Sequence, residues 1–309
     1  MVDVYHIPAM LTETVDGLNV KPDGVYVDVT FGGGGHSRAI LDRMSALKIA
    51  ECRLKNEDFG HLYSFDQDKD VLQNAIEDER WTFVHSNFRY LRNWMDYYGV
   101  DGIDGLLADL GVSFHHFDCP ERGFSFRFSA PLDMRMNQTA KRTAADIVNT
   151  YSEDELAQIF WLYGELKSGR GIARNICKAR TQRPIERTED LVAASRIPAE
   201  MSKELARLFQ ALRIEVNDEM GALREMLVAA RDLLKPGGRI AILTYHSLED
   251  RLVKNFLRSG NLEGTIEKDF YGNILTPFEL IEKGRTACAE EVEKNPRSRS
   301  AKLRIAEKK

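Results

Sequence analysis

The sequence predicts an α/β protein with a mostly parallel sheet that is interrupted by an all-helical insert. Short runs of β-branched and aromatic residues alternate with helical patterns at the start of the chain. A long central stretch then shows helical patterns only, and strand patterns return after it. Strands that alternate with helices form βαβ units, whose consecutive strands lie parallel in one sheet.

Four strands are expected before the insert, and they form the parallel part of the sheet. Runs rich in β-branched and aromatic residues mark them at 25–29, 61–65, 81–85 and 103–107. Apolar residues at helical spacing predict helices at 37–47 and 88–98, with a short one at 71–76.

The central part of the chain, 117–213, contains no convincing strand. Helical patterns predict helices at 144–149, 153–163, 170–180 and 203–212. After the breaker Lys235-Pro236-Gly237-Gly238, a strand is expected at 239–245, a helix at 247–257 and a last strand at 302–306. The polar stretch 260–299 is expected to be rich in loops. We therefore expect a discontinuous sheet domain, 1–116 with 214–309, and a helical insert, 117–213.

The composition is that of an ordinary globular protein, with 43% hydrophobic and 29% charged residues. No apolar run is long enough to span a membrane, and the first residues do not resemble a secretory signal. The four cysteines are scattered without a CxxC pair, which suits a reducing cytoplasm. The net charge is −5, so any binding of nucleic acid is expected to depend on local basic patches.

Four consecutive glycines, Gly32 to Gly35, follow the first expected strand and precede a helix. Glycines at such a place let the backbone approach a ligand closely, and four exceed what a tight turn requires. The dinucleotide fingerprint G-x-G-x-x-G fits poorly, because its third glycine position is occupied by Ser37 or Arg38. A bound ligand is therefore expected, but not specifically a nicotinamide or flavin.

Two aspartates end other expected strands and indicate what the ligand contains. Asp66 ends the second strand, where a carboxylate can accept hydrogen bonds from both hydroxyls of a ribose. Asp109 ends the fourth strand. Because ligands of open parallel sheets lie beyond the carboxyl ends of the strands, Gly35, Asp66 and Asp109 are expected to converge on one crevice that binds an adenosine-containing molecule.

At this point the chain resembles a known family, the bacterial 16S rRNA cytosine-N4 methyltransferases. The matching segments run in a fixed order through nearly the whole chain, so the resemblance is specific. They are HIPAML at 6–11, DVTFGGGGH at 28–36, DLGVS at 109–113, ERGFSF at 121–126, LDMRM at 132–136, FQALRIEVN at 209–217, HSLEDR at 246–251 and NPRSRSAKLRIA at 295–306.

The resemblance implies a class I methyltransferase, with a Rossmann-like sheet and S-adenosyl-L-methionine as the methyl donor. It implies that the sheet domain binds the donor and that the insert recognises the substrate, a specific cytosine in the decoding region of 16S rRNA within the small ribosomal subunit. A cytoplasmic protein with no membrane, metal or obligate protein partner is expected. The cofactor positions carried over from the family are Gly34, Gly35, His36, Asp66, Phe88, Asp109 and His116.

The segment after DLGVS departs from the family. The family commonly shows Ser-Pro-Gln-Leu-Asp there, whereas this chain has Phe114-His115-His116-Phe117-Asp118. His116 replaces a cofactor-contacting glutamine, and a neutral imidazole nitrogen cannot both donate and accept as an amide can. His115, His116, Asp118 and Cys119 are not expected to bind a metal, because adjacent histidines rarely point at one ion.

The sequence assigns no catalytic residue. The exocyclic amine of cytosine is a poor nucleophile, and hydrogen-bond acceptors on its N–H groups would help the nitrogen to pyramidalise. Candidate acceptors are Asp109, backbone carbonyls of the following loop and His246; a structural hydrogen bond is an equal alternative for His246. Basic residues at helical spacing with few acidic neighbours, Arg170, Arg174 and Lys178, are candidate phosphate contacts, as is Arg135 for the target nucleotide.

Two other functions remain open from the residues alone. A nucleotide-binding oxidoreductase would use the same glycine turn, although the missing third glycine argues against it. A non-catalytic ribosome-assembly factor would bind RNA and use the cofactor for structure only, and a methyl-transfer assay separates such a factor from a methyltransferase.

Overall fold

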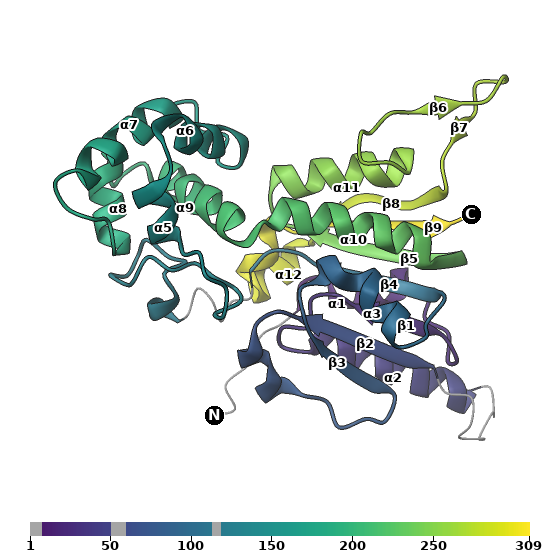
Figure 1. Cartoon of the computed structure of the whole chain (residues 1–309). Coiled ribbons are helices and arrows are strands. Elements are labelled where there is room, and N and C mark those ends of the chain that lie inside the picture. Colours follow the sequence, from purple (N-terminus) through teal and green to yellow (C-terminus); the bar gives the residue numbers. More distant parts are fainter. Residues whose placement is uncertain (1–7, 51–59, 113–118) are drawn as a thin grey trace. The chain divides into compact units, whose positions relative to one another are not determined.

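The computed structural model describes residues 8–50, 60–112 and 119–309, with the side chains of 48–50 left aside. The chain forms two compact units, residues 1–111 with 221–309, and residues 112–220 (Figure 1). The first is built around a sheet and the second is helical, and each is described by itself.

A seven-stranded sheet forms the centre of the first unit, with the order β3-β2-β1-β4-β5-β9-β8. The strands from β3 to β5 in this order run parallel, whereas β9 is antiparallel to β5 and β8 is antiparallel to β9. The expected α/β fold with a mostly parallel, Rossmann-like sheet is thus confirmed. The bounds are β1 Val25–Asp28, β2 His61–Asp66, β3 Trp81–His85, β4 Ile103–Asp109, β5 Leu234–Thr244, β8 Phe278–Thr286 and β9 Lys302–Lys308.

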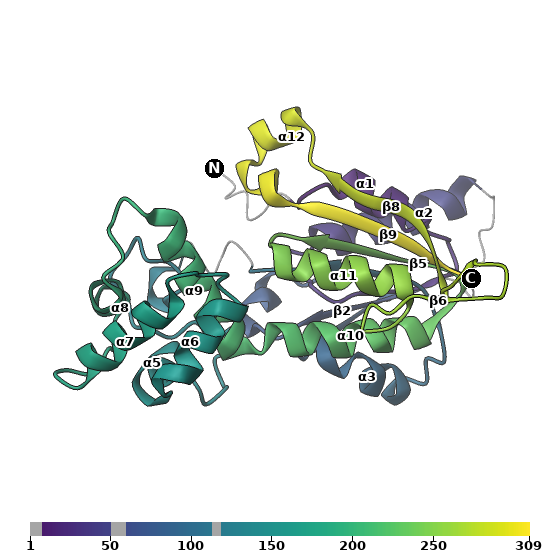
Figure 2. The same cartoon turned by 90° about the horizontal axis from the view of Figure 1, so that it is seen from above.

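Helices cover both faces of this sheet (Figures 1 and 2). On one face lie α1 (Leu11–Gly17) and α2 (Gly35–Ala50), and on the other lie α3 (Leu91–Tyr97), α10 (Glu219–Leu233) and α11 (Ser247–Ser259). Coverage on both faces explains why the central strands read as nearly continuous apolar runs. In the core under α1 and α2, Val15, Ile40 and Met44 pack with residues of β1, β2, β4, β5 and β9.

The stretch 260–299 is more regular than its polar sequence predicts. It contains the small hairpin of β6 (Glu267–Lys268) and β7 (Ile274–Leu275), the nine-residue strand β8, and the helices α12 (Ala289–Lys294) and η5 (Pro296–Ser300). The expectation of loops was wrong for β8. As an edge strand, β8 pairs with β9 and exposes alternate residues that are mostly polar, so its sequence lacks the apolar run of a central strand.

Two further expectations are corrected by local geometry. The short helix expected at 71–76 is a 3₁₀ helix, η2 (Lys69–Asn74), whose first turn is capped by Asp68. The glycines Gly237 and Gly238 do not precede β5 but lie within it, with Gly237 at φ 78°. The register with β4 shifts nearby, between Ile103 and Gly105, so the strand accommodates the glycines as an irregularity rather than ending there.

The second unit is an all-helical domain with its own core. Its helices are α5 (Ala144–Thr150), α6 (Glu153–Leu162), α7 (Gly169–Arg180), α8 (Thr188–Ser195) and α9 (Ser202–Asn217), preceded by the 3₁₀ turn η4 (Pro120–Arg122). Ser152 and Glu155 form a capping box at the start of α6, as Thr143 and Asp146 do for α5. Phe160, Ile176 and Leu208 are buried in the core that these helices share.

The second unit extends beyond the insert boundaries drawn from the sequence, 117 and 213. Helix α9 continues to Asn217, whose side chain holds the loop of the LDMRM segment. Its amide oxygen accepts a 2.8 Å hydrogen bond from Met136 N, and its amide nitrogen donates to Met134 O at 2.8 Å. A helical pattern alone does not reveal such a contact, which explains why the sequence placed the boundary too early.

Within the ranges 8–50, 60–112 and 119–309, no helix is both long enough and apolar enough to cross a membrane.

We predict that Asn217→Ala destabilises the protein by about 1–3 kcal/mol, because it leaves Met136 N and Met134 O without their partner. Denaturant unfolding followed by circular dichroism measures the change. Asn137→Ala is the matched control in the same unit, because Asn137 is half-buried and its side chain caps its own turn through Thr139. Equal loss of stability in both variants would contradict the role given to Asn217.

Candidate functional site

The strand order places a topological switch point between β1 and β4. From β1 the chain continues to β2 and β3 on one side, whereas β4 and β5 lie on the other side. In open parallel sheets, ligands bind outside the carboxyl ends of the strands at such a point. The residues that follow these strand ends are therefore the first candidates for a site.

Backbone conformation or close neighbours disfavour side chains at three positions of the glycine turn after β1. Gly32 and Gly34 have φ of 49° and 74°, a region that favours glycine. A Cβ on Gly34 would lie 2.9 Å from the ring of Phe31, and one on Gly35 would lie 2.2 Å from Cγ of Pro8. The turn thus requires glycine sterically, and it presents bare backbone at the start of α2.

Two side chains fix this turn from outside. Arg38 Nη1 donates to Gly33 O at 2.7 Å, and Asn74 Nδ2 donates to Gly32 O at 3.1 Å. Arg38 Nη2 also donates to Asn74 O at 2.6 Å, which connects α2 with η2. The backbone of the turn is therefore held in place before any ligand arrives.

Asp66, at the end of β2, faces the glycine turn. Its Oδ2 accepts a 2.9 Å hydrogen bond from Gly32 N, and its Oδ1 accepts one of 2.9 Å from Asp68 N. These bonds fix the orientation of the carboxylate. A carboxylate held in this way can accept hydrogen bonds from two neighbouring hydroxyls, such as those of a ribose.

Asp28, at the end of β1, is fully buried under this site. Ser37 Oγ donates to its Oδ2 at 2.6 Å and Thr30 N donates to its Oδ1 at 3.0 Å. Burial raises the pKa of Asp28 to about 6, although these hydrogen bonds oppose the shift. Thr30 Oγ1 also accepts a 2.6 Å hydrogen bond from Asp109 N, so Asp28 and Thr30 connect the ends of β1 and β4.

Asp109, at the end of β4, has an unusual environment. Tyr245 Oη donates a 2.7 Å hydrogen bond to its Oδ1, and His36 Nδ1 lies 3.8 Å from its Oδ2. Burial raises the pKa of Asp109 to about 7; the Tyr245 hydrogen bond opposes the shift, whereas the negative charges of Asp28 and Glu249 add to it. Asp109 therefore changes its charge near neutral pH, unlike an ordinary carboxylate.

Tyr245 was not among the residues singled out from the sequence. It follows β5 and immediately precedes the HSLEDR segment, and that position was the available signal. Its ring also lies 3.3 Å from where a Cβ on Gly111 would stand, and Gly111 has φ of 109°. The glycine therefore gives the tyrosine room to reach Asp109.

His246 occupies a structural position at the start of α11. Its Nδ1 accepts a hydrogen bond from Glu249 N at 3.4 Å in a capping box, and its Nε2 lies 3.0 Å from Glu249 Oε1. Glu249 Oε2 in turn accepts a 3.0 Å hydrogen bond from Tyr245 N. The side chain of His246 thus caps the helix, which favours a structural role for this residue over a role in substrate binding.

Phe88 begins the 3₁₀ turn η3 (Phe88–Tyr90) after β3, and it is half-buried. Asn87 caps this turn by accepting a hydrogen bond from Arg89 N at 3.0 Å. Phe88 therefore follows the carboxyl end of its strand, as Asp66 and Asp109 end theirs. His115 and His116 lie outside the described residues, as does Asp118, so the contact expected from His116 stays a prediction.

The candidate substrate residues of the insert have partners that the sequence did not show. Arg135 forms a forked pair with Asp133, at 2.7 and 2.6 Å. Arg170 lies 3.2 Å from Asp154 and Arg174 lies 3.3 Å from Glu153.

The expectation that the basic residues of 170–178 have few acidic neighbours was therefore wrong. Packing of α6 against α7 brings the acidic first turn of α6 beside them. Lys178 is exposed, and no ion pair of its side chain is seen within the described part of the chain.

The residues of the first unit suit an adenosine ligand that also carries a positive charge. Asp66 offers an oriented carboxylate to a ribose, and the glycine turn offers backbone without side chains. Asp109 offers a second carboxylate whose charge a nearby cation would favour. S-adenosylmethionine, which has a ribose, a sulfonium and an α-amino group, meets these requirements.

Comparison with known proteins agrees with this chemistry. Residues 3–309 match a protein family described as the MraW methylase family. The ribosomal RNA small subunit methyltransferase H of Phocaeicola vulgatus is 57% identical over 99% of this chain and 98% of its own length. That of Parabacteroides distasonis is 57% identical over 98% of this chain and 97% of its own length. Among solved structures, an rRNA methylase from Streptococcus thermophilus aligns over 98% of both chains with 12% identity and a TM-score of 0.39.

The family match covers nearly the entire chain, and the relatives align with it almost end to end. The chain therefore belongs to the MraW methylase family, whose members are methyltransferases that use S-adenosylmethionine.

Proposed function

We propose that this protein transfers a methyl group from S-adenosylmethionine to the exocyclic N4 of a specific cytosine in the decoding region of 16S rRNA, within the small ribosomal subunit. The observation that carries the proposal is the pair of carboxylates at the carboxyl ends of β2 and β4: Asp66 is oriented by the glycine turn, and Asp109, whose side chain is 13% exposed, accepts a hydrogen bond from Tyr245. The names of the relatives support RNA of the small subunit as the substrate.

In the proposed complex, Asp66 binds the ribose hydroxyls, and the turn Gly32–Gly35 with His36 lies against the donor. Phe88 provides an apolar wall for the adenine. The cofactor supplies an electrophilic methyl group on its sulfonium. The protein's contribution is to hold the acceptor nitrogen in line with that methyl group at near-attack distance.

Asp109 is the candidate acceptor for an N–H of the target amine. An amine nitrogen conjugated with the ring must pyramidalise before it attacks, and a carboxylate on its N–H favours that change. With a pKa of about 7, Asp109 is largely ionised only above neutral pH. Tyr245 is a positioning residue in this account, because it orients Asp109 through its 2.7 Å hydrogen bond.

The helical insert is the proposed RNA-binding part. Its α7 presents Arg170, Arg174 and Lys178 on an exposed face, with Arg170 and Arg174 in exposed ion pairs. Exposed pairs of this kind contribute only about 0–1 kcal/mol, so RNA phosphates can compete for the two arginines. The base itself has to leave its stack to reach the crevice.

We predict that Asp66→Ala weakens the binding of S-adenosylhomocysteine by about ten-fold or more, since hydrogen bonds to charged groups contribute roughly 1.5–3 kcal/mol each. Isothermal titration calorimetry measures the dissociation constant, and circular dichroism checks the fold. Asp70→Ala is the control, because Asp70 belongs to η2 rather than to the end of β2. An unchanged dissociation constant for Asp66→Ala would remove the ribose contact from the proposal.

We predict that kcat/KM for methyl transfer rises with pH through about 7 in the wild type, because the pKa of Asp109 is raised to about 7 and only the ionised form accepts an N–H. Asp109→Asn is expected to lower the rate and to abolish this rise. Tyr245→Phe, which removes a hydrogen bond that lowers the pKa, is expected to move the midpoint to higher pH. A wild-type profile in Asp109→Asn would show that the carboxylate is not needed.

We predict that changing Arg170, Arg174 and Lys178 to Gln flattens the salt dependence of binding to small subunits. Each phosphate contact that is lost lowers the log–log slope by about one. The control changes Lys141, Lys203 and Arg207 of the same unit to Gln, with the same loss of charge. Equal slopes for the two triple variants would show that the α7 face has no special role.

The substrate itself is tested with methyl incorporation into three acceptors: small subunits that lack the modification, protein-free 16S rRNA, and a short oligonucleotide with the target cytosine. Mass spectrometry then locates the methyl group. Small subunits are expected to be the best acceptor, because a preformed RNA shape satisfies several local contacts together. A methyl group on another atom or base would overturn the N4 assignment.

A further inference from the structure

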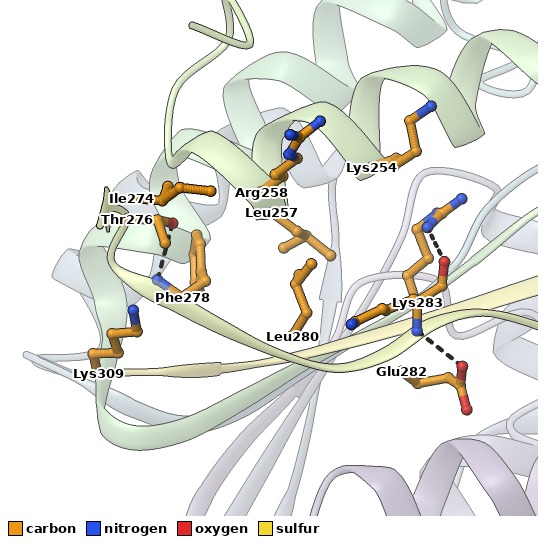
Figure 3. Close-up of a pocket in the computed structure, with 11 residues that line it drawn as sticks. Lys254, Leu257, Arg258, Ile274, Thr276, Phe278, Leu280, Glu282, Lys283 and Lys309 are labelled. Atoms are coloured by element: carbon orange, nitrogen blue, oxygen red, sulfur yellow. Dashed lines mark hydrogen bonds between the residues drawn. The ribbon is translucent and has the colours of Figure 1, made fainter. Parts of the chain in front are cut away.

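A cationic pocket lies on the first unit, away from the proposed donor site. It is formed by α11, β8 and the strand β7 with the residues that follow it, and its volume is about 450 Å³ (Figure 3). Ligand pockets generally span ~300–1,000 Å³. Its lining residues are Lys254, Leu257, Arg258, Ile274, Thr276, Phe278, Leu280, Glu282, Lys283, Arg304 and Lys309. We call it the α11–β8 pocket.

This pocket is distinct from the proposed donor site. Its strand, β8, is the edge of the sheet, and β9, β5 and β4 separate it from β1. Helix α11 starts at the carboxyl end of β5, but the pocket uses its second half, from Lys254 onward. None of its lining residues belongs to the glycine turn or to the ends of β1, β2 and β4.

The pocket combines an apolar interior with cations. The side chains of Leu257 and Leu280 point toward one another, and Phe278 is buried beside them (Figure 3). Lys254 and Arg258 are exposed one helical turn apart on α11, and Lys283 is exposed on β8. Such a combination suits a ligand that has both apolar surface and negative charge.

The cations of the pocket are not neutralised equally. Arg304 is engaged, because its Nε donates to Asp250 at 2.8 Å and its Nη1 donates to Lys283 O. Lys254, Arg258 and Lys283 form no ion pair within the described residues. The acidic lining residue, Glu282, accepts a 2.8 Å hydrogen bond from Lys283 N, and its carboxylate points away from α11 (Figure 3). Three positive charges thus remain for an external anion, in a chain whose net charge is −5.

The hairpin next to the pocket presents two aromatic rings to solvent. Phe270 and Tyr271, at its tip, are 97% and 86% exposed. Asp269 fixes the tip, accepting hydrogen bonds from Tyr271 N at 2.9 Å and Asn273 N at 2.8 Å. The two rings contact each other edge to face, with centroids 5.6 Å apart. Large apolar groups held in solvent by an ordered turn indicate a partner surface.

We propose that the α11–β8 pocket and the aromatic tip form an accessory binding surface for an unpaired segment of ribosomal RNA. Lys254, Arg258 and Lys283 contact its phosphates, and Phe270 and Tyr271 stack on its bases. Cationic grooves with exposed aromatics are the means by which proteins bind single strands, because every base has a face for stacking. Bases within RNA helices are already stacked, so an unpaired segment is the occupant that fits.

This inference rests on the proposed function in one respect, that the RNA belongs to the substrate. Binding is therefore measured separately from catalysis, with purified small ribosomal subunits and without methyl donor. Changing Lys254, Arg258 and Lys283 to Gln is expected to lower the log–log salt slope of binding by about two, since each single-strand phosphate contact contributes about 0.7. Binding of S-adenosylhomocysteine should not change.

The matched control changes Lys21, Arg43 and Arg92 to Gln. These cations are also exposed and belong to the first unit, but each pairs with a carboxylate outside the pocket. The control removes the same charge and is expected to keep the wild-type slope. If both triple variants lower the slope equally, general charge explains the binding and the pocket is excluded.

The aromatic tip is tested with Phe270→Ala and Tyr271→Ala combined, which is expected to weaken binding about ten-fold, because one stacked base contributes about 1–3 kcal/mol. Tyr97→Ala, at another exposed ring, is the control. A photoreactive phenylalanine analogue at position 270 then identifies the neighbour. Crosslinks to RNA support the proposal, whereas crosslinks only to ribosomal protein overturn it.

These outcomes separate the two proposals. If the wild type binds small subunits but transfers no methyl group, and the pocket variant lowers the salt slope of binding, the proposed function is refuted and the pocket proposal stands. If the wild type transfers the methyl group and the pocket and tip variants bind as the wild type does, the pocket proposal is refuted and the proposed function stands.

Discussion

The carboxyl edge of the sheet depends on the hydrogen bonds that hold Asp28 and Asp109, two carboxylates at the ends of neighbouring strands. Asp28 is fully buried and is stabilised by Ser37 and Thr30. Thr30 in turn accepts a hydrogen bond from the backbone of Asp109, so one network joins the glycine turn, the start of α2 and the end of β4. Burying an acidic group costs free energy unless it is well hydrogen-bonded, and this requirement limits how the turn and the strand ends can be arranged.

Burial also changes the ionisation of the second of these carboxylates. Asp109 would be permanently ionised at the surface, but in this position its pKa is raised to about 7 and Tyr245 fixes its orientation. Asp66, by contrast, is oriented by two backbone N–H groups and is half-buried. The carboxylates at the ends of β2 and β4 are thus held by different partners, which suits the roles proposed for them, one in holding a ribose and the other in contact with a reacting amine.

Most of the fold was predictable because its signals are local. Strand and helix periodicities, the glycine run and the aspartates that end β2 and β4 are all visible in the sequence. The failures at β8, Tyr245 and Arg174 share one physical cause, since they concern residues whose partners are distant along the chain. Strand β8 exists because β9 pairs with it, Tyr245 matters through Asp109, and Arg174 is neutralised by Glu153 of another helix. None of these contacts leaves a periodic pattern.

The sequence by itself determined the α/β class, the helical insert and the family, because apolar periodicity and long ordered motifs are properties of the chain. It also identified Asp66 and Asp109 by their positions at strand ends. Only the tertiary structure decided the environment of the charged groups: Asp28 is fully buried, Tyr245 reaches Asp109, and the cations beside β8 form no ion pair among the described residues. Electrostatic character depends on distance and burial, and folding sets both by bringing together residues such as Asp109 and Tyr245, or Lys254 and Lys283, that are far apart in the sequence.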